Sequence, residues 1–593
     1  MSRPGPILAS LLRLAADAWS VAAACGLLAV AVHLGALKND FVFDDVPAIV
    51  ENPLVDGSSD ASAFTSNFWG ARRGFEHVTT YRPLTTLSFR LTHALFGPGP
   101  TAFHSTNLVL HALVSALVVG LLWTWFGRMR EARIGAAVGG MLFAVLPVHV
   151  EAIAGAVNRA ELQSTALVLL SLIAWGRATV VDGWRRNARY GVAIAAFAAA
   201  ALSKEQAITT PAVVVLFELM RRAQAGDAPP PIPRWPLVAL VLVAVGVVAA
   251  RAAVLPAILG GDVPPLDNPL AHTDALTRLR TVPKLLFESL RLLFAPHRLT
   301  ADWSAHAIPL TTTWSDADSW AGLVLGAGGL ALLVGAVRTR QVPLAMLLAW
   351  FFGQWALIGS VFFPSTILLA ERVLYLPSVP VVMLVGLVVG IVHDRLAFPA
   401  MRLNLLAAVV LIVALFAGRS IQRVADWHDG LSLFASAVRV APDSARARMN
   451  LAIELRARGA FEEAEDHARA ALALVPDDPD ALVGLAEVRV DRGLAGEAVA
   501  LARRSMARRP SRAGIRVLCR ALGTQGDDAP GTVDACGLAV REWPRDPMVH
   551  HLLGRALLAV GKRSEAVAAL ETALACAPGH AAITADLARA RAP

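Results

Sequence analysis

The stretch ADAWSVAAACGLLAVAVHLGALKNDFVFDDVP, residues 16–47, joins a long apolar run to two adjacent aspartates. Residues 16–37 are long enough to cross a bilayer, whose hydrocarbon core requires about 20 apolar helical residues. FVFDDVP (41–47) then places Asp44 and Asp45 side by side at the mouth of this span. An acidic pair in a loop is usually a solvated turn, but ionisable groups at a membrane edge favour a functional site. The apolar run lacks a convincing cleavage site, so we predict a retained span.

The composition excludes an ordinary soluble protein. The 593-residue chain is 56% hydrophobic and 17% charged, and apolar runs of spanning length recur along it. The formal net charge of +8 lies largely in short loops such as 128–133 and 184–189, which is typical of cytoplasmic loops of membrane proteins. We therefore predict a multi-pass membrane protein in contact with lipid, and no nucleic-acid partner.

The apolar runs predict about eleven membrane spans. They lie near 16–37, 104–126, 134–148, 160–180, 190–203, 206–220, 236–257, 319–337, 342–362, 374–393 and 401–419. Placing the short basic loops in the cytoplasm puts the N-terminus there and the segment from 420 onward outside. Loops 38–103 and 258–318 are then external. The stretch 281–295 is too charged to cross; a crossing there would move the tail to the cytoplasm.

The tail has a repeat of its own. From residue 426 the sequence is rich in Ala, Arg, Glu and Leu, and prolines recur every 34 residues, at Pro442, Pro476, Pro510, Pro544 and Pro578. This period predicts tetratricopeptide hairpins that stack into an α-solenoid with a groove for a protein ligand. We therefore expect an all-α chain with a membrane domain at 1–425 and repeats at 426–593.

Two irregularities stand out in the tail. In the third repeat, DDAPG (527–531) interrupts the turn, which predicts a distorted or partly uncapped hairpin. The four cysteines have no metal-ligand spacing, and we predict no disulfide framework from them.

Charged residues gather in the predicted external loops. Beside the aspartates, the candidates for binding a substrate or its phosphate are Arg82, His149, Glu151, Arg159, Lys204, Glu205, Glu371 and Arg372. Single charges at a membrane edge often only extend to the headgroups, and Lys204–Glu205 or Glu371–Arg372 could simply neutralise each other. The clustering of both signs on one side, from several loops, favours a site.

Both signs of charge suit transfer of a group from a lipid phosphate to a hydroxyl. Guanidinium and ammonium groups stabilise a phosphate leaving group, which points to Arg82, Arg159, Lys204 and Arg372. A carboxylate takes the proton of the acceptor hydroxyl. Asp44 or Asp45 is the candidate for this general base. No cofactor is required by the sequence, although Asp44 and Asp45 are candidate ligands for Mg²⁺ or Mn²⁺. His149 lacks zinc spacing with His104 and His111 and is better explained by hydrogen bonding.

The chain resembles the transmembrane and tetratricopeptide-repeat protein O-mannosyltransferases, which are integral-membrane glycosyltransferases of the GT-C class. The resemblance runs through eight segments along the chain. They are FVFDDVPAIVENP (from residue 41), YRPLTTLSF (from 81), FHSTNLVLH (from 103), HVEAIAGAVNRAEL (from 149), LSKEQAIT (from 202), DNP (from 267), PHRLTADWS (from 296) and AERVLYLPS (from 370). It implies a GT-C fold, a polyprenyl-phosphate mannose donor and serine or threonine acceptors on a protein. It also implies that Asp44 and Asp45 form the catalytic acidic motif.

The composition, rich in Arg and Ala and poor in Lys, suggests a bacterial inner-membrane protein with periplasmic repeats. Two other functions stay open on the sequence. One is a lipid-linked sugar transferase that modifies an envelope glycan or lipid. The other is a non-catalytic membrane scaffold whose repeats bind partners. The charges lie at one membrane face and not at mid-membrane, which argues against a transporter.

Overall fold

The computed structural model describes residues 18–59, 61–70, 80–225, 234–255 and 263–592. Within these ranges every regular element is a helix, which confirms the predicted all-α class. By its contacts the chain forms two compact units, one ending at Ser436 and one beginning at Ala437. Parts of the predicted external loops, at 60, 71–79 and 258–262, lie outside the described residues, as does the N-terminus that we expect in the cytoplasm.

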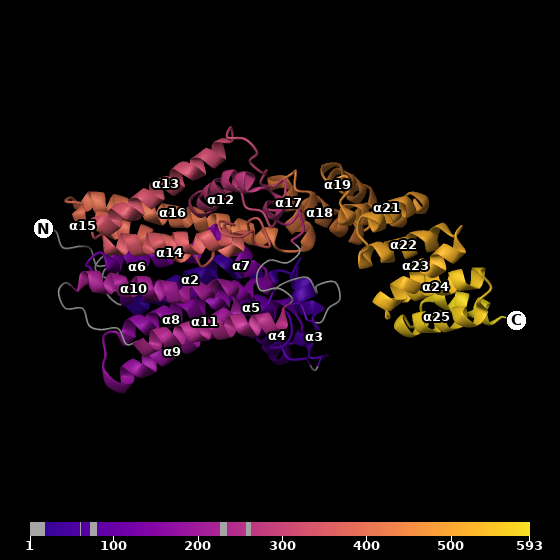
Figure 1. The fold of residues 1–593 in the computed structure, drawn as a ribbon, viewed down its shortest axis with the longest axis horizontal. Coiled ribbons are helices and arrows are strands. Elements are labelled where there is room, and N and C mark those ends of the chain that lie inside the picture. Colours follow the sequence, from indigo (N-terminus) through magenta and orange to yellow (C-terminus); the bar gives the residue numbers. More distant parts are fainter. Residues whose placement is uncertain (1–17, 60, 71–79, 226–233, 256–262, 593) are drawn as a thin grey trace. The chain divides into compact units, whose positions relative to one another are not determined.

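Unit 1 is a bundle of long helices joined by short helical turns (Figure 1). The long helices are α2 (Ala18–His33), α4 (Pro83–Phe96), α5 (Pro100–Phe126), α6 (Ala132–Val145), α8 (Arg159–Ala178), α9 (Gly183–Ser203), α10 (Thr210–Gln224), α11 (Arg234–Val254), α12 (Ala275–Phe294), α13 (Ala317–Arg338), α14 (Val342–Ile358), α15 (Ser378–Arg395) and α16 (Pro399–Asp426). The short ones are η1 (Leu34–Lys38), η2 (Val46–Val50), α3 (Pro53–Asp56), η3 (Pro147–His149), α7 (Val150–Ala154), η4 (Ala156–Asn158), η5 (Glu205–Thr209), η6 (Pro269–His272) and η7 (Glu371–Leu374). The first loop, with α3 and α4, lies at one end of the bundle (Figure 1).

The described part of the chain has fewer helices of membrane-spanning character than the sequence predicted. Six qualify by length and composition, namely α2 with η1, α5, α11, α13, α15 and α16, and a seventh is the pair α6–α7 if this bent pair forms one span. The prediction of eleven is therefore wrong by this measure. The amphipathic stretch 281–295, within α12, does not qualify as a span, in agreement with the sequence.

Four of the predicted spans, at 160–180, 190–203, 206–220 and 342–362, are helices in the structure but do not qualify as spans. They correspond to α8, α9, α10 and α14. α10 and α14 have 15 and 17 residues and are short for a bilayer. α8 starts with polar and charged residues, and most of its side chains are buried between neighbouring helices. A helix enclosed by others can satisfy polar groups inside the bundle, so its sequence need not be uniformly apolar.

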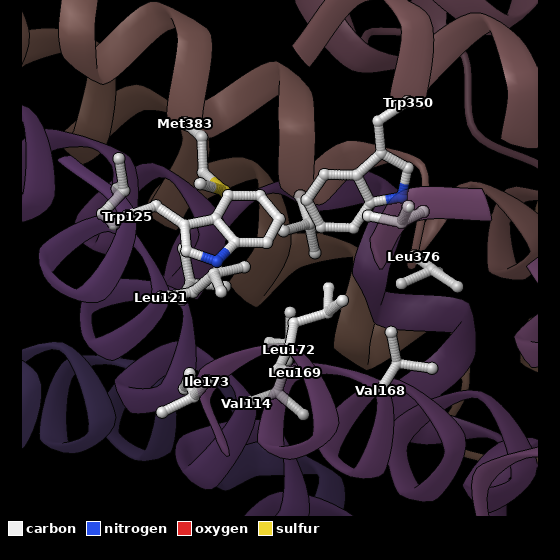
Figure 2. Packing of buried hydrophobic residues seen from close by; sticks show 14 of the residues in the cluster. Val114, Leu121, Trp125, Val168, Leu169, Leu172, Ile173, Trp350, Leu376 and Met383 are labelled. Carbon is white, nitrogen blue, oxygen red and sulfur yellow. The ribbon is translucent and has the colours of Figure 1, made fainter. Parts of the chain in front are cut away.

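The core of unit 1 is packed around aromatic and aliphatic side chains from α5, α8, α14 and α15. Figure 2 shows Trp125 and Trp350 among leucine, isoleucine and valine side chains, and the centroids of the two indole rings lie 5.7 Å apart. α6 and α15 approach closely: a Cβ atom on Gly386 would lie 2.2 Å from the carbonyl oxygen of Gly135. Small residues permit such close helix packing in membranes. The loops that carry the polar residues therefore start from a tightly packed scaffold.

Unit 2 consists of four helical hairpins and a last helix, as the 34-residue period predicted. After α17 (Gly430–Val440) come α18 (Ala445–Ala457), α19 (Phe461–Leu474), α20 (Pro479–Asp491), α21 (Ala495–Arg508), α22 (Arg512–Gln525), α23 (Ala529–Glu542), α24 (Pro547–Ala559), α25 (Arg563–Cys576) and α26 (Ala581–Arg591). Gly459, Gly493 and Gly561 have φ of 78°, 78° and 80° at the hairpin turns. Glycine adopts this left-handed backbone without steric cost, which explains its place in the repeat.

The third hairpin corrects two predictions. Its second helix is capped, because the Asp528 carboxylate accepts a hydrogen bond of 2.8 Å from the Gly531 amide, and Gly526 turns the chain with φ of 81°. The hairpin is therefore not uncapped. In addition, Cys519 on α22 and Cys536 on α23 form a buried disulfide, although we predicted no disulfide. The two cysteines are 17 residues apart, a spacing that matches no known cysteine motif, so their pairing could not be predicted from the sequence.

Candidate functional site

The two adjacent aspartates occupy different environments. Asp45 is fully buried, and its two carboxylate oxygens accept hydrogen bonds from the backbone amides of Val157, at 2.7 Å, and Val42, at 3.2 Å. Burial raises the pKa of Asp45 to about 7, although these amides lower it. Asp45 therefore holds the first loop against η4 and is inaccessible to a substrate in this conformation.

Asp44 is only partly buried, so it is the accessible member of the pair. The residue before it, Phe43, has φ of 52°, a left-handed backbone that is uncommon for a residue with a bulky side chain. Its ring packs edge-on against Phe434, with centroids 5.5 Å apart. Strained backbone of this kind is frequent at functional sites, where the surrounding packing maintains it. The turn at Phe43 thus leads directly into the aspartate that a substrate could reach.

Asp44 interacts electrostatically with an ion pair formed by two other segments. Glu151, on α7, is buried and pairs with the guanidinium of Arg372, on η7. The same carboxylate accepts a hydrogen bond of 2.8 Å from the Arg372 backbone amide. Burial lowers the pKa of Arg372, but Glu151 and then Asp44 outweigh burial and raise it. The structure therefore brings Asp44, Glu151 and Arg372 together from three separate segments.

Glu371, the residue before Arg372, is fully buried. Glu371 Oε1 accepts a hydrogen bond of 2.6 Å from the Thr300 backbone amide. The same oxygen lies 3.6 Å from the guanidinium of Arg423, on α16. Burial raises the pKa of Glu371 to about 8 in spite of Arg423. Glu371 therefore connects the loop after α12 to the segment that carries Arg372.

A second group of charges surrounds the turn between α9 and η5. We call Arg82, Glu161, Lys204, Glu205 and Arg251 the Glu205 cluster. Lys204 pairs with Glu161, and both side chains are nearly buried. Glu205 pairs with Arg82 at 3.0 Å and with Arg251 at 3.2 Å. Burial would raise the pKa of Glu205, but Arg82, Lys204 and Arg251 lower it to about 2.

Arg251 was missed by the sequence analysis. It lies in the last turn of α11, inside the predicted span 236–257. Its position could have been noticed in the sequence, because an arginine within an apolar run of a membrane protein indicates a candidate functional site.

Two of the predicted ligands lie in the interior instead. The guanidinium of fully buried Arg159 donates to Thr92 Oγ1 at 2.8 Å, to the Ser88 carbonyl at 3.0 Å and to Asn107 Oδ1 at 3.1 Å. The imidazole of His149, also buried, contacts the Phe143 carbonyl at 2.9 Å and Ser378 Oγ at 2.8 Å. These contacts occupy the donor atoms that phosphate binding would need. Both side chains stabilise the scaffold in this conformation.

The residues do not fit a metal site. Among the residues that the structure describes, no three or more His, Cys, Asp or Glu side chains are placed to hold one ion. Of the acidic pair, Asp45 directs both oxygens to backbone amides, and Mg²⁺ or Mn²⁺ prefers several oxygen ligands at once. Asp45 is therefore not available as a metal ligand in this conformation.

Comparison with known proteins gives family matches in both parts of the chain. The family described as "Protein O-mannosyl-transferase TMTC, DUF1736" matches residues 262–327. The tetratricopeptide repeat family matches residues 417–479 and 450–513. The first match covers α12, the start of α13 and the loop between them, from which Thr300 bonds to Glu371.

Curated relatives point to the same family. The chain is 28% identical to Protein O-mannosyl-transferase Tmtc3 of Drosophila melanogaster, over 74% of this chain and 53% of that protein. It is 28% identical to TMTC3 of Homo sapiens, over 76% and 50%, and 29% identical to TMTC1 of Homo sapiens, over 77% and 55%. The chain thus spans about half the length of the relatives it matches.

A solved structure was also found. The oligosaccharyltransferase of Archaeoglobus fulgidus, crystallised with a tethered acceptor peptide, matches 75% of this chain and 58% of its own, with 15% identity and a TM-score of 0.37. That likeness is too low to support an argument. The sequence matches in both units show that the chain is similar to the TMTC family of protein O-mannosyl-transferases.

Proposed function

We propose that this chain is a GT-C glycosyltransferase that transfers a sugar, mannose, from a polyprenyl phosphate to serine or threonine hydroxyls of a protein. The observation that carries the proposal is the placement of Asp44. It is the accessible aspartate of the motif, beside the Glu151–Arg372 pair, in a chain related to protein O-mannosyl-transferases.

The proposed chemistry needs a base and a cation. The Asp44 carboxylate takes the proton of the acceptor hydroxyl. The hydroxyl oxygen then forms a bond to the anomeric carbon of the sugar, and the bond from that carbon to the phosphate oxygen breaks. Arg372 stabilises the charge that develops on the departing phosphate, since a guanidinium suits phosphate geometry. Glu151 fixes Arg372 through its side chain and its backbone amide. Asp45 positions the loop and touches no reacting atom.

The sidedness is also a proposal. We place the N-terminus in the cytoplasm, and the acidic loop and the repeats on the periplasmic side of a bacterial inner membrane. Support comes from the basic loops and from the Cys519–Cys536 disulfide, since disulfides persist in oxidising compartments such as the periplasm. The repeats would hold the acceptor polypeptide, as tetratricopeptide surfaces commonly do.

The test is a transfer assay with the purified full-length chain in lipid nanodiscs. Polyprenyl-phosphate mannose is the donor, and a mixture of unfolded periplasmic proteins is the acceptor. We expect mass spectrometry to find hexose on serine or threonine. Transfer to an envelope glycan or lipid, with no modified protein, would contradict the proposed acceptor. Absence of any transfer by a folded chain would contradict the proposed activity.

A further inference from the structure

The segment around the end of α16 borders the candidate site. We call residues 420–434 the junction segment; it contains the end of α16 and the start of α17, and it lies within unit 1, which ends at Ser436. It is fixed to the helix bundle, since Ser420 Oγ donates a hydrogen bond of 2.8 Å to the Val145 carbonyl.

The junction segment is hydrogen-bonded to the start of the acidic loop. The Asp40 amide donates to the His428 carbonyl at 2.9 Å. The buried side chain of Asn39 donates to the Val424 carbonyl at 3.4 Å. The loop that carries Asp44 is therefore fastened to the junction segment a few residues before the aspartate.

The junction segment also contacts the two segments that carry the ion pair. Arg423, which is fully buried, lies 3.6 Å from the carboxylate of Glu371, the neighbour of Arg372. Trp427 lies against Gly155, at the end of α7: a Cβ atom on this glycine would lie 3.3 Å from the indole ring. α7 is the helix whose carboxylate pairs with Arg372. One short segment thus touches all three segments that supply the candidate site.

Phe434 contacts the residue that precedes Asp44. Its side chain is 3% exposed, and its ring lies edge-on to the ring of Phe43, with an interplanar angle of 84°. The left-handed backbone of Phe43, with φ of 52°, is disfavoured for a residue with a Cβ atom by enough to shift a local equilibrium about tenfold. On the other side of Asp44, Asp45 is anchored to the Val157 amide. Asp44 therefore lies between two anchored residues, and Phe434 supplies one of the anchors.

We propose that Phe434 is a positioning residue for Asp44, and that the junction segment is part of the transfer site. This inference rests on the proposed function, in which Asp44 is the base. The Phe434 ring holds Phe43 in the left-handed turn. This turn, together with the buried Asp45, fixes the direction of the Asp44 carboxylate.

Removal of the ring should let the turn relax. In Phe434→Ala the aromatic contact is gone, so Phe43 returns to the right-handed or extended conformations that its side chain favours. The Asp44 carboxylate then reaches its position in a smaller fraction of molecules. A misplaced base lowers kcat, whereas donor binding through Arg372 is unchanged.

The first measurement does not depend on activity. It follows hydrogen–deuterium exchange of the full-length chain in lipid nanodiscs, by mass spectrometry of peptides that contain residues 41–48. Amides of this turn are hydrogen-bonded: Asp45 N–H donates to the Val42 carbonyl at 3.0 Å and Ala48 N–H to the Asp44 carbonyl at 3.1 Å. Their exchange reports how often the turn opens. We expect Phe434→Ala to accelerate it about tenfold and Phe434→Leu, which keeps an apolar side chain, to accelerate it less; unchanged exchange in both would overturn the inference.

Phe416→Ala is the matched control. Phe416 is a partly buried phenylalanine on α16 that packs against the hydrophobic core of unit 1. Its loss should lower the melting temperature, as any lost core contact does, but should leave exchange at 41–48 as in the wild type. Equal acceleration by Phe416→Ala and Phe434→Ala would overturn the inference, because the effect would then be general loosening.

The second measurement is the kinetics of sugar transfer. We expect Phe434→Ala to lower kcat about tenfold, with a KM for polyprenyl-phosphate mannose within about twofold of the wild type. Phe416→Ala should retain the wild-type kcat. A higher KM with unchanged kcat in Phe434→Ala would overturn the inference, since that pattern marks lost substrate binding.

A double-mutant cycle tests whether Phe434 acts through Phe43. In Phe43→Gly the ring contact is already absent, and glycine adopts the left-handed turn without steric cost. Adding Phe434→Ala to this variant should therefore change kcat by less than about twofold. The same tenfold loss in both backgrounds would overturn the part assigned to the ring contact.

Failure of the inference and failure of the proposed function can be told apart. A wild-type chain that transfers sugar, with exchange and kcat unchanged by Phe434→Ala, overturns the inference alone. A wild-type chain that transfers no sugar, while Phe434→Ala accelerates exchange at 41–48 and Phe416→Ala does not, overturns the proposed function and supports the hold of Phe434 on the turn.

Discussion

Replacing Asp45 by alanine tests the division of labour between the two aspartates. The Asp45 carboxylate is fully buried and satisfies the amides of Val157 and Val42. Without it, two buried N–H donors lose their acceptor. A buried donor left without a partner costs about 1–3 kcal/mol, so we expect a loss of roughly 2–6 kcal/mol in the free energy of unfolding. Asp45→Asn keeps one acceptor oxygen and should lose about half as much.

The assay is thermal inactivation in detergent, followed as the monodisperse fraction on size-exclusion chromatography. At about 2 °C per kcal/mol for a domain of a few hundred residues, Asp45→Ala should lower the apparent melting temperature by roughly 4–12 °C. Asp44→Asn is the matched control one residue away. Because Asp44 is partly exposed, its melting temperature should stay within about 1 °C of the wild type. An Asp45→Ala chain as stable as the wild type would refute the reasoning.

Three further predictions concern stability. Replacing Cys519 and Cys536 by serine should cost unit 2 about 3 kcal/mol, since the disulfide closes a loop of 17 residues; urea unfolding followed by limited proteolysis measures it, and an unchanged midpoint would contradict it. Burial raises the pKa of Glu371 to about 8, so its contribution to stability is full below the ordinary carboxyl range and is lost as the pH rises through 8. Melting temperatures should therefore fall between about pH 5 and pH 8, and Glu371→Gln should flatten this fall; an equal slope in both proteins would count against it. Lys204→Met leaves the nearly buried Glu161 carboxylate unpaired and should cost about 3–5 kcal/mol, whereas Lys204→Arg keeps the charge and should cost less by the same melting assay.

Local signals in the sequence were enough to predict the repeats. A hairpin turn that needs positive φ requires a small residue at a fixed place, and Gly459, Gly493 and Gly561 meet that need. The apolar runs at 104–126 and 236–257 also became helices close to their predicted bounds. These features depend on neighbouring residues, which a single sequence displays directly.

Other features depend on contacts between distant residues. Asp44 and Asp45 look equivalent in sequence, and only the approach of Val157, 112 residues beyond Asp45, buries one of them. Arg251 looks like a charge at the end of a span until η5 places Glu205 beside it. The number of spans was overestimated for the same reason, since burial of α8 among other helices decides its environment.

The most direct test of the central claim is the rate of sugar transfer by Asp44→Asn in nanodiscs. Loss of a positioned general base lowers rates by about 10²–10⁴, so we predict at least a hundredfold lower kcat with binding of the isoprenoid phosphate unchanged. A folded Asp44→Asn chain that transfers mannose at the wild-type rate would contradict the account.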